Sequence, residues 1–210
     1  NITTGISGVD SVNISAGTNI IYGGVGAIAI DLAGGATTVN GAAGVANISL
    51  AGGVNTIIAG TGANNVTVTD GTNAITTGAG TDSYTLSGGT NVITGDTTTA
   101  DSFTISAGTN TITTGTDTLS ITGGINTVTG TGSNIISLAG GTNIINASTV
   151  NPDTITLSAG TNTVYGNTAN STINITAGTA NTITGGSGAE TVNISGGTGN
   201  QVATGAGNDI

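Results

Sequence analysis

The chain has 210 residues and contains ten acidic residues but no Lys, Arg, His, Cys, Met or Trp, so its formal net charge is −10. Binding to nucleic acid or to an anionic membrane surface needs cationic side chains, and nucleophilic catalysis needs a base such as His or Lys, so the composition argues against these functions. Disulfides and thiol chemistry are excluded, and no apolar stretch approaches the ~20 residues of a membrane-spanning helix.

An Asn followed two positions later by Ile or Val recurs along the whole chain at steps of 16 to 19 residues, and Thr37 takes the place of one Asn. Self-similarity at a nearly fixed period indicates a repeat architecture. The residues of this series are Asn19, Asn55, Asn73, Asn91, Asn110, Asn126, Asn143, Asn162, Asn181 and Asn200.

A second element stands five or six residues before each Asn, where an apolar, polar, apolar triplet ends. Alternation of large apolar residues bounded by Gly is typical of a short strand with one buried face. The apolar pairs, in chain order, are Val12 and Ile14, Ile30 and Leu32, Ile48 and Leu50, Val66 and Val68, Tyr84 and Leu86, Phe103 and Ile105, Leu119 and Ile121, Ile136 and Leu138, Ile155 and Leu157, Ile173 and Ile175, and Val192 and Ile194.

Together the two elements predict an all-β fold, a single parallel β-solenoid with two short strands per coil of about 18 residues and about eleven coils. We expect one continuous domain over residues 1–210, because no charged or Pro-rich linker divides the repeat. The alternative is a disordered, Gly-rich chain. The fixed phase of the apolar residues argues against it, because a disordered chain has no inward face that requires them. Both termini fall within a coil, which predicts an excerpt of a longer protein or a subunit that stacks end to end.

Several turns follow the pattern GxGxDxU, in which U is a large apolar residue. The clearest copy is Gly78-Ala79-Gly80-Thr81-Asp82-Ser83-Tyr84, and Gly205-Ala206-Gly207-Asn208-Asp209 repeats it. This pattern resembles the nonapeptide repeat of the RTX (hemolysin-type calcium-binding) family, which forms a parallel β-roll with Ca²⁺ in its turns. The likeness covers the chain as a period, but only about a third of the turns as a motif.

The Asn series occupies the place at which RTX turns carry a ligating Asp. Neutral amides bind hard cations such as Ca²⁺ weakly, whereas stacked Asn side chains can hydrogen-bond to one another along the stack. We therefore expect the Asn series to form a structural ladder that needs no metal.

The opposite turn places acidic residues two positions before several triplets, and Asp82, Asp101 and Asp117 fall in three consecutive coils. Like charges stacked about 5 Å apart repel by a few kcal/mol at intermediate dielectric, unless a cation binds or the pKa values rise. Since the chain has no Lys or Arg, we predict a Ca²⁺ site here. The alternative is that these residues form turns, with their carboxylates in solvent. The predicted metal-ligating residues are Asp82, Asp101, Asp117, Asp10, Asp153, Asp209 and Glu190.

The outward positions beside the Asn series are rich in Thr, as in Thr109 with Thr111 and Thr161 with Thr163. Such ranks resemble those of ice-binding proteins, although Val54, Val92, Ile20, Ile125 and Ile144 interrupt them. Thr is also a good strand residue for an exposed face, and a face without charge suits packing against another solenoid.

These observations predict a protein that is not an enzyme. The resemblance implies an extracellular or cell-surface structural protein, such as a bacterial S-layer protein, a filament or an adhesin. Its expected partners are copies of itself, in a lattice or a filament, with no nucleic acid and no membrane insertion. The alternative is a module that binds ice or a cell-surface glycan through the Thr-rich face.

Overall fold

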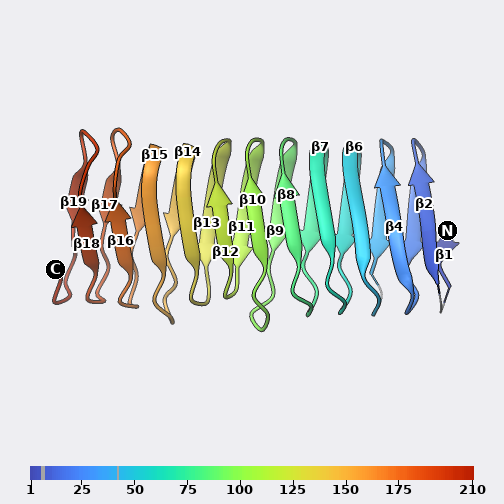
Figure 1. The fold of residues 1–210 in the computed structure, drawn as a ribbon, viewed down its shortest axis with the longest axis horizontal. Helices are drawn as coiled ribbons and strands as arrows, with labels where there is room; N and C mark the ends of the chain where they lie inside the picture. Colours follow the sequence, from blue (N-terminus) through green and yellow to red (C-terminus); the bar gives the residue numbers. More distant parts are fainter. Residues whose placement is uncertain (6–7, 42) are drawn as a thin grey trace.

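The computed structural model describes residues 1–5, 8–41 and 43–210, and it forms one β-solenoid of about eleven coils. The chain winds along the long axis of a rod, with successive coils side by side from the N-terminus to the C-terminus (Figure 1). The strands are β1 (Ile2–Thr3), β2 (Val9–Ile14), β3 (Thr18–Tyr22), β4 (Ala27–Leu32), β5 (Ala36–Asn40), β6 (Ala46–Ile58), β7 (Asn65–Thr76), β8 (Ser83–Leu86), β9 (Thr90–Thr94), β10 (Ser102–Ile105), β11 (Thr109–Thr114), β12 (Thr118–Ile121), β13 (Ile125–Gly130), β14 (Ile135–Asn146), β15 (Thr154–Tyr165), β16 (Thr172–Ile175), β17 (Thr182–Thr184), β18 (Thr191–Ile194) and β19 (Gln201–Ala203).

All the strand pairings are parallel, and each strand pairs with the equivalent strands of the neighbouring coils. Phe103 of β10, for example, pairs with Tyr84 of β8 on one side and with Leu119 of β12 on the other. The predicted parallel β-solenoid is therefore confirmed, including its period of about 18 residues.

The rod has two broad faces. The first, which we name the Asn face, is the outer side of β3, β5, β9, β11, β13, β17 and β19 and of the second halves of β6, β7, β14 and β15. The second, which we name the triplet face, is the outer side of β2, β4, β8, β10, β12, β16 and β18 and of the first halves of the same four strands.

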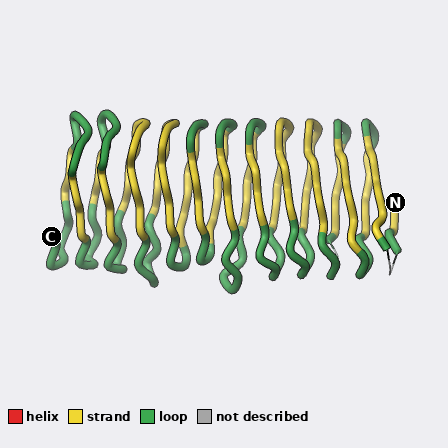
Figure 2. Tube along the Cα trace, in the orientation of Figure 1, coloured by secondary structure: helices red, strands yellow, loops and turns green. Residues whose placement is uncertain are grey.

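Four coils carry one long strand in place of the two short strands that we predicted. The strands β6, β7, β14 and β15 continue through the corner between the two faces, where the tube of Figure 2 stays in the strand colour. The pairing register is irregular at residues 50–54 and 138–142. The corner keeps hydrogen bonds between coils, as in Val54 N–H to Gly35 O at 2.9 Å, so the pairing is not interrupted there.

The core is a narrow stack of Ile, Leu and Val side chains from both strands of the interior coils, nearly all of them fully buried. In the last coil, which no further coil covers, Ile194 and Val202 are 54 % and 37 % exposed, so the predicted burial of Ile194 is wrong. Each such side chain stabilises the fold by about 1.5–3 kcal/mol relative to an exposed one. The largest are Tyr84 and Phe103, whose rings stack with centroids 4.9 Å apart and an interplanar angle of 13°. The parallel register places these two aromatic residues at equivalent positions of adjacent coils, which is why their rings meet.

Candidate functional site

The candidate site is the interior of the rod, where two columns of polar side chains run parallel to the apolar core. One column is the Asn series. The other holds the acidic residues. Both are built by the register of the parallel strands, which places equivalent residues of successive coils directly over one another.

In the Asn column, the Nδ2 group of each residue donates to the Oδ1 atom of the next, at 2.7–2.9 Å, from Asn55 through to Asn200. The same Nδ2 group donates to a carbonyl of the corner in its own coil, at 2.9–3.4 Å. An amide has both donors and acceptors, so each Asn closes its own corner and links two coils. The structure places the predicted ladder in one column with these bonds.

The Asn column is interrupted near its beginning. Asn19 donates only to Ala16 O, at 3.2 Å, and Thr37 occupies the next rung. The buried Oγ1 of Thr37 and the buried Oδ1 of Asn55 have no hydrogen-bond partner among the described residues. Thr37 therefore breaks the ladder, because its hydroxyl is too short to span the distance between rungs.

The acidic column has a different bonding scheme, in which each side chain accepts the backbone N–H of the equivalent residue in the preceding coil. Asp82 accepts from Asn64, Asp101 from Asp82, and Asp117 from Asp101, at 2.7–2.8 Å. In the next two coils, Asn134 Oδ1 accepts from Asp117 N–H at 3.1 Å, and Asp153 Oδ1 accepts from Asn134 N–H at 2.8 Å. A carboxylate only accepts, so backbone N–H groups supply the donors that the neighbouring side chains lack.

These acidic side chains are interior and not turn groups in solvent, so the alternative of solvated turn formers is wrong for Asp82, Asp101 and Asp117. Their exposed fractions are 1 %, 2 % and 2 %. They lie in phase with the buried residues that follow, as in Asp82, Tyr84 and Leu86. That alternation was the signal in the sequence for their burial.

The surroundings of Asp101 set it apart within this column. Five of the six carboxylate oxygens of Asp82, Asp101 and Asp117 accept N–H or O–H bonds, including those from Gly78, Tyr84 and Gly115. The sixth, Oδ2 of Asp101, is buried without a hydrogen-bond partner in the described part of the chain.

Burial raises the pKa of Asp101 to about 7, and the neighbouring carboxylates of Asp117 and Asp82 add to this effect. Burial likewise raises the pKa of Asp117 and of Asp153. The pKa of the Tyr84 hydroxyl is also raised, by burial and by the charge of Asp82, to which it donates at 3.1 Å. Burial thus favours the protonated form of Asp101, Asp117 and Asp153.

The other predicted metal-ligating residues lie along the same column but further apart. Asp10 accepts from Gly5 N–H at 2.6 Å, and Asp209 accepts from Glu190 N–H at 3.0 Å. Glu190 is fully buried with both carboxylate oxygens unpartnered among the described residues, and burial beside Asp209 raises its pKa. Asn134 and Ser171 separate Asp153 from the remaining acidic residues.

This donor set does not by itself supply a Ca²⁺ coordination shell. Calcium takes six to eight oxygen ligands, whereas Asp82, Asp101 and Asp117 offer one oxygen that is not already an acceptor. Within residues 1–5, 8–41 and 43–210, no three acidic side chains are grouped closely enough to hold a metal ion.

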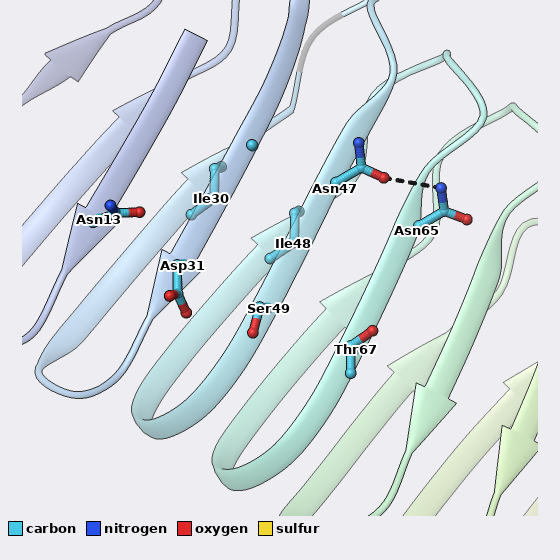
Figure 3. Close-up of a pocket in the computed structure, with 9 residues that line it drawn as sticks. Asn13, Ile30, Asp31, Asn47, Ile48, Ser49, Asn65 and Thr67 are labelled. Carbon is cyan, nitrogen blue, oxygen red and sulfur yellow. Dashed lines mark hydrogen bonds between the residues drawn. The ribbon is translucent and has the colours of Figure 1, made fainter. Parts of the chain in front are cut away.

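The triplet face carries an open hollow of about 340 Å³ that our sequence interpretation missed (Figure 3). Its rim is polar, and Asn65 donates to Asn47 Oδ1 at 2.9 Å across two coils. The small side chains of Ala29 and Ser49 create the hollow beside the larger Asn and Asp residues. Its lining residues are Asn13, Ala29, Ile30, Asp31, Asn47, Ile48, Ser49, Asn65 and Thr67.

Comparison with protein-family models, with curated proteins and with solved structures finds no match to this chain. The resemblance to RTX repeats therefore remains a prediction from the sequence. No helix in the described part of the chain is long and apolar enough to cross a membrane.

Proposed function

We propose that this chain is a structural protein of the cell exterior, a stiff rod that assembles with copies of itself into a layer or a filament. The single observation that carries the proposal is the Asn column, in which eight consecutive amide hydrogen bonds join nine coils inside the rod. A continuous series of interior hydrogen bonds along the axis from Asn55 to Asn200 resists separation of the coils and so favours a mechanical role.

The arrangement of the coils supports a mechanical role. Each coil contacts only its neighbours, so the stability of a solenoid is approximately a sum over coils and the interfaces between them. From the coil of Asn55 to that of Asn200, each interface carries the backbone hydrogen bonds of two strands, an apolar contact and a rung of the Asn column. The first coils lack this rung at Thr37, and Ile28 and Ala46 stand at positions of the acidic column, so resistance to stretching is greatest over the nine coils from Asn55 onward.

Negative-stain electron microscopy and light scattering of the purified chain test this function. We expect sheets or filaments whose repeat matches a rod on the order of 50 Å for eleven coils. A monodisperse monomer at all concentrations, with and without Ca²⁺, would contradict self-assembly.

We keep calcium stabilisation as a separate proposal, supported by the absence of Lys and Arg from the chain and by the Oδ2 atom of Asp101, which has no hydrogen-bond partner among the described residues. The other ligands of the ion would be water or oxygens that now accept hydrogen bonds. Calorimetric titration at pH 8, where Asp101 is ionised, is expected to show heat uptake or release and a higher melting temperature. Asp101→Asn should remove both effects, whereas Asp31→Asn on the triplet face should retain them. The absence of heat and of any thermal shift in the unmodified chain would end this proposal.

A second candidate function is binding of ice or a glycan. The exposed Thr109 and Thr111 on the Asn face favour ice, and the polar hollow on the triplet face favours a hydroxyl-rich glycan. Thermal hysteresis of the purified chain tests ice binding, and a glycan-array assay tests glycan binding. A rod that only assembles with copies of itself gives no signal in either assay.

A further inference from the structure

The ten acidic residues are distributed unequally over the rod, and none of them lies on the Asn face. Seven belong to the acidic column, of which five are buried and two, Asp10 and Asp209 in the terminal coils, are half-buried. Of the others, Asp31 lies on the triplet face, Asp70 in a corner and Asp96 in the loop before β10. With no Lys or Arg in the chain, the Asn face is formally uncharged although the protein carries a charge of −10.

The Asn face also exposes large apolar side chains in interior coils. Val54, Val92, Ile125 and Ile144 are 60 %, 51 %, 61 % and 42 % exposed. They lie on the two outward files that flank the Asn column, where the other residues are mostly Thr. On the triplet face, Ile135 is the corresponding exposed residue of an interior coil, at 56 %.

The dimensions of this face match those of a stable interface. Eleven coils at ~4.8 Å and five strand residues at ~3.3 Å give a surface of roughly 50 by 17 Å, or about 850 Å². A standard protein interface buries about 800 Å² per partner. Flat sheets also pack face to face at about 10 Å when their side chains interdigitate, as short Thr and branched Val and Ile side chains can.

We propose that the Asn face is the lateral contact through which two copies of this chain pair, face to face about a twofold axis. The proposal rests on the assembly function above and names the surface that performs it. A twofold contact uses the same patch on both partners, so an uncharged patch places no like charges directly opposite each other across the contact. The acidic residues then face the interior or the outside of the pair.

The matched test compares Ile125→Asp with Ile135→Asp. Both residues are the first of their strands, β13 and β14, and both are similarly exposed, but they lie on opposite faces. Ile125→Asp places a charge on both sides of the proposed contact and should weaken pairing at least tenfold in sedimentation equilibrium. Ile135→Asp should leave the dissociation constant within twofold of that of the unmodified chain, and both variants should retain its circular dichroism spectrum.

Val92→Asp, in a different coil of the same face, provides a second variant and should weaken pairing similarly if Ile125→Asp fails to fold. Filaments or sheets that persist with unchanged dissociation constants in Ile125→Asp and Val92→Asp would overturn the lateral contact and leave the assembly function intact. An unmodified chain that stays monomeric would overturn both. If the monomer shows thermal hysteresis and these variants abolish it, the Asn face binds ice, and the proposed pairing is overturned.

Discussion

At the level of single residues, the difference between Asn and Asp decides how each interior column is held. Asn110 donates to Ala107 O and to Asn126 Oδ1 while it accepts from Asn91, so three hydrogen bonds are satisfied by one buried amide. Asp117 has no donor and needs the N–H groups of Asp101 and Gly115. The amide column is therefore neutral and continuous, while the acidic column depends on backbone donors and on protonation.

Thr37 is the residue at which the amide column can be improved. Thr37→Asn would place an amide between Asn19 and Asn55, accept from the first and donate to the unpartnered Oδ1 of the second. Each new buried hydrogen bond contributes about 0.5–1.5 kcal/mol, and satisfying a buried orphan acceptor adds to this. We expect Thr37→Asn to increase the free energy of unfolding by about 1–3 kcal/mol in urea denaturation.

Thr38→Asn is the control for this prediction, because Thr38 is the neighbouring residue of β5 and alternates to the outer face. It should change the free energy of unfolding by less than about 0.5 kcal/mol, as is usual for surface substitutions. Equal effects of the two substitutions would show that the added stability does not come from the ladder.

At the level of elements, the corner between the two strands of a coil depends on a residue with positive φ. Gly89 has φ of +77°, and a Cβ atom built there would lie 2.7 Å from the carbonyl oxygen of Gly71 in the preceding coil. Ala180 stands in a longer corner with φ of 56°, where the equivalent residue of the next coil is Gly199. The left-handed region disfavours residues with a Cβ atom by roughly 1–2 kcal/mol.

Substitutions in these corners should therefore have opposite signs. Gly89→Ala combines backbone strain with a clash against the neighbouring coil, and we expect it to reduce the free energy of unfolding by more than about 2 kcal/mol. Ala180→Gly removes strain and should raise the melting temperature, with a gain of up to about 1 kcal/mol. A destabilised Ala180→Gly variant in thermal melts would contradict this account of the corner.

The elements themselves could be predicted because apolar residues and Asn recur in a fixed phase, and each coil repeats the same evidence for a strand. The inward direction of Asp82 was missed although it shares the phase of Tyr84 and Leu86, since a carboxylate is expected in solvent unless a partner is known. Its partner is the backbone N–H of Asn64, which only the register of the coils brings to it. The hollow at Ala29 depends in the same way on side-chain sizes in neighbouring coils.

At the level of the whole molecule, the interior acidic column makes the stability of the rod depend on pH in an unusual direction. Burial raises the pKa of Asp101 from 3.8 to about 7 and also raises those of Asp117, Asp153 and Glu190. The folded state then binds more protons than the unfolded state between about pH 4 and 7, so stability falls as the pH rises through that window. Asp96 contributes a pH dependence of the opposite sign, because its pKa is lowered. Burial would raise this pKa, but the hydrogen bonds from Thr99 and Thr98 outweigh burial.

We therefore predict that the free energy of unfolding, measured with urea at pH 4 to 8, is greatest near pH 4 and decreases toward pH 7 and above. A shift from 3.8 to about 7 at Asp101 corresponds to at most about 4 kcal/mol. Asp101→Asn should flatten the pH profile and increase the free energy of unfolding at pH 8. The new amide can still accept from Asp82 N–H and can donate to Asp117 Oδ1. Such donation already occurs in this column, from Asn64 to Asp82 and from Asn134 to Asp153.

Asp31→Asn, which removes an exposed carboxylate from the triplet face, should leave the slope between pH 4 and 7 unchanged. A profile that rises from pH 4 to 7 in the unmodified chain would mean that the column is charged and compensated when folded. A profile that becomes flat only when Ca²⁺ is added would identify the ion as that compensation, because a bound cation replaces the proton as the partner of Asp101. The two measurements together thus distinguish a protonated interior from a metal-bound one.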